Sequence, residues 1–273
     1  DCMRRDLTIN ALYTNISTGE IVDITGKGVD DIKNHIIRTP NDPDTIYDDD
    51  PLRILRCIRF ASRYGWEIEY DTYEGMVRNV SRLEIITKER VKDEFCKMLT
   101  CKHPIMAMEL LRKIGAMHYV IPELEETYSM TQNEYHFGTV WEHTMMVLEG
   151  TKDDNMILRI SALLHDIGKI RVCTEEDGKI HFLKHELKSG EMIDELLRPL
   201  KFSNEIIKEV TFLVRNHMIC KTWGSECEYM KDKKLRRLQY ECKTEERFRN
   251  LMTIIDADNN AYAADKCMPK QVE

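Results

Sequence analysis

The strongest constraint on the fold is a change in the spacing of apolar residues near residue 29. From about that point onward, apolar side chains recur every three or four residues, which predicts α-helices. Helix starts are indicated at Asp50-Pro51 and at Thr87-Lys88-Glu89. Residues 3–24 instead alternate apolar and polar residues around Ser17-Thr18-Gly19-Glu20, which predicts two strands joined by a turn. The chain is therefore expected to be mostly α, with a short β hairpin near its start.

Composition limits the class of protein. The 273 residues are 42% hydrophobic and 32% charged, which suits two or three folded modules. No apolar run approaches the roughly 20 residues of a membrane span, and no signal-peptide pattern is present. Nine cysteines are scattered without a C-x-x-C pair, which favours reduced thiols and a cytoplasmic location. A net charge of −8 does not indicate nucleic-acid binding, so RNA contacts would need local basic stretches.

Four arginines recur after Asp50. At about 100° per residue they share one helix face, whereas Leu52 and Phe60 fit neither that face nor the apolar one. Guanidinium groups can bind phosphate or pair with a base edge, and Asp50 can accept a hydrogen bond from an amino group. The same spacing also describes a solvated face with charge pairs, so both interpretations stay open. The arginines are Arg53, Arg56, Arg59 and Arg63, and the apolar face consists of Ile54, Cys57, Ile58 and Ala61.

Histidines and aspartates characterise the second half of the chain. His165 and Asp166 follow an apolar helical run and precede Gly168, which is expected to end the turn, and Lys169. A carboxylate beside an imidazole suits a divalent metal. Any one histidine in isolation is more often a packed or surface residue, but the joint pattern predicts metal binding. The further candidate ligands are His143, His185, His217 and Asp258.

Four motifs in the first half resemble those of class II tRNA nucleotidyltransferases, the family of CCA-adding enzymes and bacterial poly(A) polymerases. They occur in the family's order at compatible spacing. Asp49 stands where the family usually has Glu. The motifs are Arg4 to Leu12 (R-R-D-L-T-I-N-A-L), Asp23 to Arg38, Asp49 to Arg53 (the E-D-x-x-R template) and Glu89 to Leu99 (E-R-x-x-x-E).

The resemblance implies roles for single residues in nucleotide binding. Arg5 would contact the incoming nucleotide, and Asp50 with Arg53 would read the base edge of ATP or CTP. Arg56 and Arg59 would hold phosphate or complete the pocket. The family's Gly-Gly loop and its D-x-D pair, which binds Mg²⁺ for nucleotidyl transfer, are expected to precede Asp1. The chain is therefore expected to be N-terminally truncated and unable to polymerise alone.

Structural roles are expected for the other motif residues. Asp6 and Asn10 would brace the strand and turn, and Glu89, Arg90 and Glu94 would form a buried salt-bridge network. A basic cluster from Lys231 to Arg237 could contact tRNA phosphates or simply be a solvated helix start.

The order of histidines and aspartates resembles that of the HD phosphohydrolase superfamily. This implies an all-helical bundle in which His165, Asp166 and Lys169 are catalytic, with Lys169 orienting phosphate. The metal would be Ni²⁺, Mn²⁺, Co²⁺, Fe²⁺ or Mg²⁺. Asp258 is preferred to Asp256 because Ala257-Asp258 matches the family's A-D pair, and the two carboxylates lie about 200° apart round a helix. His181 is expected on a hairpin spanning 172–182 rather than at the metal.

The expected architecture has three parts: a nucleotidyltransferase head remnant (1–37), a helical neck that binds nucleotide and RNA (38–125) and an all-helical HD domain (126–273). The implied function is tRNA 3′-end maturation, with tRNA, CTP and ATP as partners and no membrane association. Three alternatives remain. They are a poly(A) polymerase or A- or CC-adding relative, a separate metal-dependent phosphohydrolase acting on nucleotides or RNA ends, and a non-catalytic RNA-binding remnant.

Overall fold

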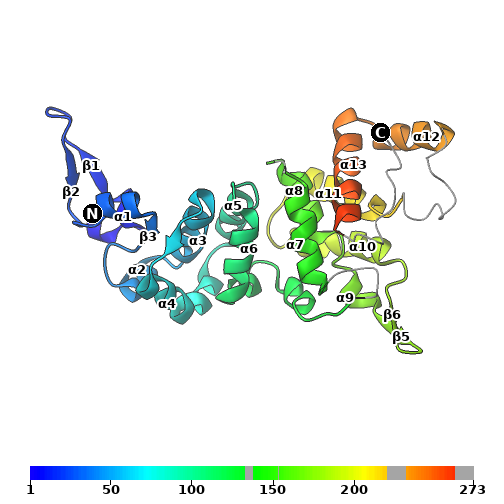
Figure 1. Ribbon diagram of the computed structural model, residues 1–273, viewed down its shortest axis with the longest axis horizontal. Helices are drawn as coiled ribbons and strands as arrows, with labels where there is room; N and C mark the ends of the chain where they lie inside the picture. The colour runs from blue at the N-terminus through cyan, green and yellow to red at the C-terminus, as the bar shows by residue number, and fades with distance from the viewer. Residues whose placement is uncertain (133–137, 153, 220–231, 262–273) are drawn as a thin grey trace. The chain divides into compact units, whose positions relative to one another are not determined.

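The computed structural model describes the chain except for residues 133–137, 153, 220–231 and 262–273, together with the side chains of 232–235. It contains two compact units, Asp1–Val120 and Ile121–Glu273. Helices dominate both units and the strands are only two or three residues long, which confirms the mostly α class (Figure 1). Among the described residues, every helix is too short or too polar to cross a membrane.

The first unit begins with a hairpin in which β1 (Leu12–Thr14) and β2 (Ile21–Asp23) pair antiparallel. The prediction of a strand before Leu12 is wrong, because Cys2–Arg4 and Thr8–Asn10 form 3₁₀ helices. The Asp6 carboxylate accepts hydrogen bonds from the Leu7 amide at 2.9 Å and the Asn10 side chain at 3.1 Å. Such local bonds from a short polar side chain compete with pairing in a sheet.

Helices make up the rest of the first unit. The predicted helix starts are confirmed, since Pro51 is the N-cap of α3 and Thr87 is the N-cap of α5. The predicted apolar face of α3 is also confirmed, because all four of its residues are fully buried. The elements are α1 (Gly28–Asn34), β3 (Ile36–Ile37) parallel to β4 (Glu67–Ile68), α2 (Pro43–Asp49), α3 (Leu52–Tyr64), α4 (Tyr70–Asn79), α5 (Lys88–Leu99) and α6 (Pro104–Lys113), with 3₁₀ helices at Val80–Ile85 and Ala116–Tyr119.

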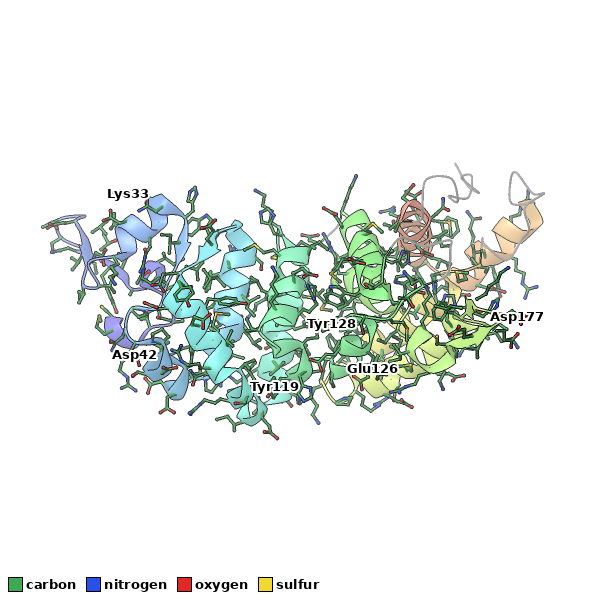
Figure 2. All side chains as sticks on the ribbon, turned by 60° about the horizontal axis from the view of Figure 1, so that its bottom comes forward. Lys33, Asp42, Tyr119, Glu126, Tyr128 and Asp177 are labelled. Carbon is green, nitrogen blue, oxygen red and sulfur yellow. The ribbon has the colours of Figure 1, made fainter. Side chains whose placement is uncertain are left out.

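The second unit is a helical bundle with one hairpin. Its core joins three helices through Leu158, Leu213, Leu251 and Ile254, all almost completely buried. The predicted hairpin is confirmed, and Asp177 at its turn is labelled in Figure 2. The elements are a 3₁₀ helix (Pro122–Thr127), α7 (Val140–Gly150), α8 (Met156–Leu164), α9 (Lys169–Val172), β5 (Thr174–Glu176) antiparallel to β6 (Lys179–His181), α10 (His185–Leu197), α11 (Asn204–Asn216), α12 (Asp232–Cys242) and α13 (Glu245–Asn260).

Candidate metal centre and nucleotide-binding residues

Six predicted ligands from five helical segments converge inside the second unit. Three overlapping groups of three have ligand atoms within 4.8 Å of one another, and each residue is at most 9% exposed. The segments explain this arrangement, because α8 and α11 both end at a histidine and α10 begins at one. The residues are His143 on α7, His165 and Asp166 after α8, His185 on α10, His217 after α11 and Asp258 on α13.

Asp166 lies at the middle of this cluster. Its Oδ2 atom is 3.5 Å from His143 Nε2 and 3.3 Å from His165 Nε2. Its Oδ1 atom is 3.1 Å from His185 Nε2 and 3.6 Å from His217 Nε2. The two oxygens therefore face two different pairs of imidazoles. A carboxylate placed in this way would offer one oxygen ligand beside each pair.

Asp258 lies beside the first of these two pairs, the imidazoles of His143 and His165. Its Oδ1 atom lies 3.1 Å from His143 Nε2 and 4.0 Å from His165 Nε2. Asp256, two residues earlier on α13, is exposed. The expected choice of Asp258 as the inward-facing carboxylate is therefore confirmed, and so is the placement of His181 outside the cluster, on β6.

The backbone orients three of the histidines. His165 Nδ1 lies 2.8 Å from the carbonyl oxygen of Ala162, and the same bond to the carbonyl three residues earlier recurs at His185 and His217, at 2.9 and 2.7 Å. A carbonyl only accepts hydrogen bonds, so each Nδ1 carries the proton. In the neutral form of each ring, Nε2 then presents a lone pair to the cluster, which is how backbone partners orient metal-bound histidines.

Burial and charge set the protonation states. Burial lowers the pKa of His143 and of His217 and so favours the neutral imidazoles that bind metals. Burial also opposes protonation of His165, but the Asp166 carboxylate outweighs this effect and raises the pKa of His165. Burial alone would raise the pKa of Asp166, yet the charges of His165, Lys169 and His185 hold that pKa well below its ordinary value.

The donor set fits a divalent metal. His217 Nε2 is fully buried and accepts no hydrogen bond, although its ring is held in place through Nδ1. Imidazole nitrogens and carboxylate oxygens suit Ni²⁺, Mn²⁺, Co²⁺ and Fe²⁺ in particular. Electron pairs of this many nitrogens and oxygens repel one another at these distances unless a cation or a proton lies between them. The residues are therefore appropriate for holding a metal.

Lys169 lies beside the cluster and is 1% exposed. Its Nζ atom is 2.7 Å from Asp166 Oδ2 and donates to Gln132 Oε1 at the same distance. Gln132 also donates to the carbonyl of Thr139 at 3.0 Å, next to the start of α7. Gln132 belongs to none of the sequence motifs, and only its position in a polar segment just before α7 could have suggested it.

Gly168 has a different role from the expected one. Its φ of −64° is ordinary helical backbone, so it does not end the turn by adopting a left-handed conformation. A Cβ atom there would lie 2.3 Å from the Ser189 amide nitrogen and 2.5 Å from the His185 carbonyl oxygen. The Gly168 amide donates to Ser189 Oγ at 2.8 Å. Glycine therefore allows the His165-Asp166 segment to approach α10 closely.

The arginines of α3 are tied to the N-terminal motif. Asp49 accepts from Arg4 Nε at 3.2 Å and lies 3.8 Å from Arg53 Nη1, which also donates to the Ile46 carbonyl at 2.9 Å. Arg56 pairs with the buried carboxylate of Asp6, with its Nε 2.7 Å from Oδ2. The bracing role expected for Asp6 and Asn10 is thus confirmed, and Asp6 in addition holds an arginine.

The remaining candidate nucleotide ligands have other partners. Arg5 is exposed and donates to Asp1 at 3.1 Å and to the Tyr13 hydroxyl at 3.4 Å. Arg90 donates to the Asp50 carboxylate at 2.7 Å. Arg59 is buried, with its Nε 2.5 Å from Glu94 Oε2.

The expected buried network around α5 is only partly correct. Glu94 is 3% exposed and pairs with Arg59 and Lys97, which confirms its structural role. Glu89 and Arg90 are exposed, so for these two residues the expectation is wrong. They lie on the turn of α5 that faces solvent, one helical turn before Glu94. The basic cluster from Lys231 to Arg237 falls largely outside the described residues, apart from the exposed Arg236 and Arg237.

The bundle and its histidine–aspartate cluster define an HD domain, and the family model of the HD domain matches residues 133–259. The model of the poly(A) polymerase head domain matches residues 1–38, and the probable RNA- and SrmB-binding site of polymerase A matches residues 65–127. The chain belongs to the tRNA nucleotidyltransferase family of CCA-adding enzymes and poly(A) polymerases, in the branch that carries an HD domain.

Known proteins of this family resemble the chain over most of its length. The multifunctional CCA protein of Neisseria gonorrhoeae is 33% identical over 225 residues, which are 80% of this chain and 53% of that protein. That of Actinobacillus pleuropneumoniae is 33% identical over 233 residues, which are 81% and 55% of the two chains. The chain thus spans about half the length of these relatives. The Bacillus stearothermophilus CCA-adding enzyme in complex with CTP has the same fold, with a TM-score of 0.66 at 21% identity over 96% of this chain and 55% of that chain.

Proposed function

We propose that the chain takes part in maturation and repair of tRNA 3′ ends. In this proposal residues 1–37 and 38–125 belong to a nucleotidyltransferase that adds CCA from CTP and ATP with Mg²⁺, and residues 126–273 form a metal-dependent phosphohydrolase that processes RNA ends. The relatives named as multifunctional CCA proteins support both parts. A cytoplasmic location, as for other tRNA maturation, is part of the proposal.

Nucleotide selection is assigned to the start of α3. Asp50 and Arg53 carry the groups needed to pair with a base edge, and both are held by neighbours that leave further hydrogen-bonding capacity. Asp50 is fixed by Arg90 and by the Leu52 amide, which donates at 3.1 Å. Arg53 is fixed through one Nη atom and has donors remaining on its planar fork. Arg5, Arg56 and Arg59 would supply positive charge for the phosphates.

The observation that carries the hydrolase part is the burial of four imidazoles and two carboxylates in one cluster, with Asp166 at its centre. A divalent cation bound there would supply Lewis acidity toward a phosphoryl oxygen and make water a better nucleophile. Asp166 holds its negative charge at neutral pH because three cationic or ionisable groups surround it. Lys169 places a fixed positive charge 2.7 Å from that carboxylate, where it also complements the charge of a bound phosphate.

The hydrolase is tested with the whole chain and 2′,3′-cyclic AMP as substrate. His165→Ala and Asp166→Ala are each expected to lower bound transition metal, measured by elemental analysis, and to reduce hydrolysis by at least about 100-fold, because a ligand is lost. His181→Ala is the matched control, since this histidine lies on β6 outside the cluster, and it should keep both metal and activity. Hydrolysis that survives both ligand substitutions would reject the assigned site.

A further inference from the structure

Aromatic rings follow one another from α3 to β4 in the first unit. Phe60 stacks on Tyr64 with centroids 6.1 Å apart, Tyr64 lies 4.9 Å from Trp66, and Trp66 stacks on His35 at 5.0 Å. These four rings form an aromatic row. Tyr64 is 42% exposed, and Phe60 and Trp66 are half-buried. Phe60 is one of the two residues that fitted neither face of α3, and its stacking in this row accounts for its position.

Arginines alternate with these rings. The Arg59 guanidinium lies 4.1 Å from the centroid of Phe60, and the Arg63 guanidinium lies 5.6 Å from that of Tyr64. Arg63 is exposed, and the proposed function gives it no role. Exposed rings with cations beside them are the combination by which proteins bind single-stranded nucleic acid, because bases stack on rings while phosphates meet positive charge.

A hollow of about 540 Å³ lies beside Arg59 and Arg63, the two arginines next to the aromatic row. Its charged lining residues are all cationic, namely Arg59, Arg63, Lys97 and Lys102. The buried carboxylate of Glu94 pairs with Arg59 and Lys97. The four positive charges and this one negative charge sum to a local charge of +3. The whole chain carries −8. The hollow is therefore positively charged although the whole chain is negatively charged. A phosphate group is the ligand whose charge is complementary to it.

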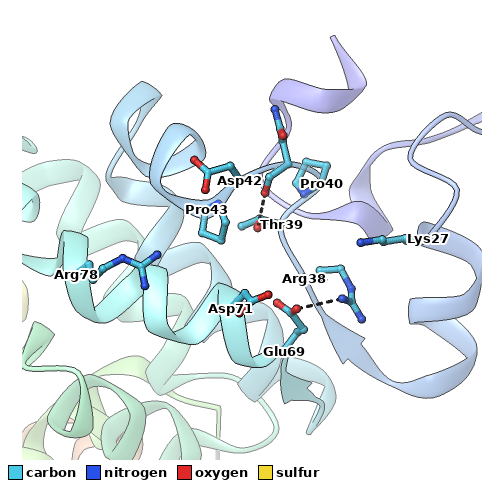
Figure 3. A pocket seen from close by; sticks show the side chains of 10 residues that line it. Lys27, Arg38, Thr39, Pro40, Asp42, Pro43, Glu69, Asp71 and Arg78 are labelled. Atoms are coloured by element: carbon cyan, nitrogen blue, oxygen red, sulfur yellow. Dashed lines mark hydrogen bonds and ion pairs between the residues drawn. The ribbon is translucent and has the colours of Figure 1, made fainter.

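A second hollow in the same unit provides the contrast. It measures about 460 Å³ and is lined by Lys27, Arg38, Arg78, Asp42, Glu69 and Asp71, so its charges balance (Figure 3). Arg38 there donates to Glu69 at 3.1 Å, the ion pair drawn as a dashed line, and also pairs with Asp31. A hollow with balanced, internally paired charge does not attract an anion, whereas the hollow beside the aromatic row does.

We propose that the aromatic row and the cationic hollow form a binding subsite for a single-stranded segment of RNA, with bases against Tyr64 and its neighbouring rings and backbone phosphates beside Arg63 and Lys102. The inference rests on the proposed function in taking RNA as the partner. Arg53, assigned to base selection, and Tyr64 are eleven residues apart on α3, which corresponds to about 16 Å along the helix. The exposed contacts of the subsite, Tyr64 and Arg63, therefore lie at the far end of the helix from Arg53, and Arg59 lies between the two ends.

The test measures binding of the whole chain to a fluorescein-labelled single-stranded RNA of about eight nucleotides by fluorescence anisotropy over a series of salt concentrations. Arg63→Ala and Lys102→Ala are each expected to weaken binding about threefold or more and to reduce the slope of log Kd against log salt by about 0.7, as for one lost phosphate contact. Tyr64→Ala is expected to weaken binding about fivefold or more without changing that slope, because stacking involves no counterion.

Two control variants separate this subsite from general effects. Tyr64→Phe keeps the ring and is expected to bind RNA as the unchanged chain does. Lys33→Ala removes an exposed cation from the same unit, on α1 and outside the hollow, and is expected to leave affinity and salt slope unaltered. All the substituted side chains are exposed, so circular dichroism should show the same helix content in every variant.

Each outcome decides the inference. If the RNA and a tRNA both bind but the Arg63, Lys102 and Tyr64 variants bind equally well, the subsite is rejected while the proposed function stands. If Lys33→Ala weakens binding as much as Arg63→Ala, the RNA is attracted by the positive charge of the whole surface, and the subsite is likewise rejected. If neither RNA binds the unchanged chain, both proposals fail. Complete displacement of the RNA by excess ATP would identify a free-nucleotide site instead.

Discussion

Asp166 connects the two halves of the metal centre at the scale of single residues. Its Oδ2 atom faces His143 and His165, and its Oδ1 atom faces His185 and His217. The adjacency of His165 and Asp166 in the sequence explains only the contact between these two side chains. The contact with His185 depends on the close approach of the His165-Asp166 segment to α10, which Gly168 allows, and the contacts with His143 and His217 depend on how α7 and α11 pack against α8.

Gly168→Ala is expected to destabilise the second unit by about 1–3 kcal/mol, because its Cβ would overlap backbone atoms of α10 that cannot move independently. Since one of these atoms belongs to His185, bound metal should fall as well. The measurements are urea unfolding and elemental analysis. Gly19→Ala provides the comparison: φ there is +73° with open space around it, so about 1 kcal/mol of backbone strain is expected and no loss of metal. Unchanged metal content in Gly168→Ala would contradict this account.

At the scale of elements, α3 performs several tasks on its different faces. Its apolar face is fully buried, its first turn holds Arg53 just after Asp50, and its last turn contributes Tyr64 and Arg63 to a solvent-facing surface. Arg59 occupies the boundary between these faces, where it reaches Glu94 on α5. The Arg59–Glu94 pair therefore joins two helices through charges that are almost completely buried.

Glu94→Gln is expected to lower the free energy of unfolding by about 3–5 kcal/mol, because it leaves the Arg59 charge buried without a charged partner. The double variant Arg59→Met, Glu94→Gln should recover much of this loss, since no unpaired charge remains. Urea unfolding of the single and double variants gives the coupling energy. Arg78→Met breaks an exposed pair with Asp44 and should have little effect. Additive losses in the double variant would show that the two side chains are not coupled.

At the scale of the whole molecule, the chain contains two compact units, and the six candidate metal ligands all belong to the second. These ligands come from helices separated by as many as 115 residues, from His143 to Asp258. A cation that binds the folded cluster but not the unfolded chain stabilises the unit that supplies the ligands. The first unit shares none of them.

Chelation of the metal is expected to destabilise the second unit selectively. At a free metal concentration of about 100 times Kd, bound metal contributes about 2.7 kcal/mol, so its removal should speed exchange of the most protected amides about 100-fold. Hydrogen–deuterium exchange should show this in α7, α8, α11 and α13 but not in α3 or α5. Asp258→Asn, which removes a ligand, should make exchange insensitive to the chelator. Equal acceleration in both units would argue against a metal confined to the second.

The sequence by itself determined the helical class, the starts of α3 and α5, the apolar face of α3 and the hairpin with His181. These features follow from spacing along one segment, and spacing is preserved when a segment folds. Only the tertiary structure decided that Gln132 contacts Lys169, that Gly168 is needed for helix contact, that Arg59 is buried against Glu94, and that Arg63 and Lys102 border one hollow. Those contacts join residues from different segments, whose approach depends on how helices pack rather than on any local pattern.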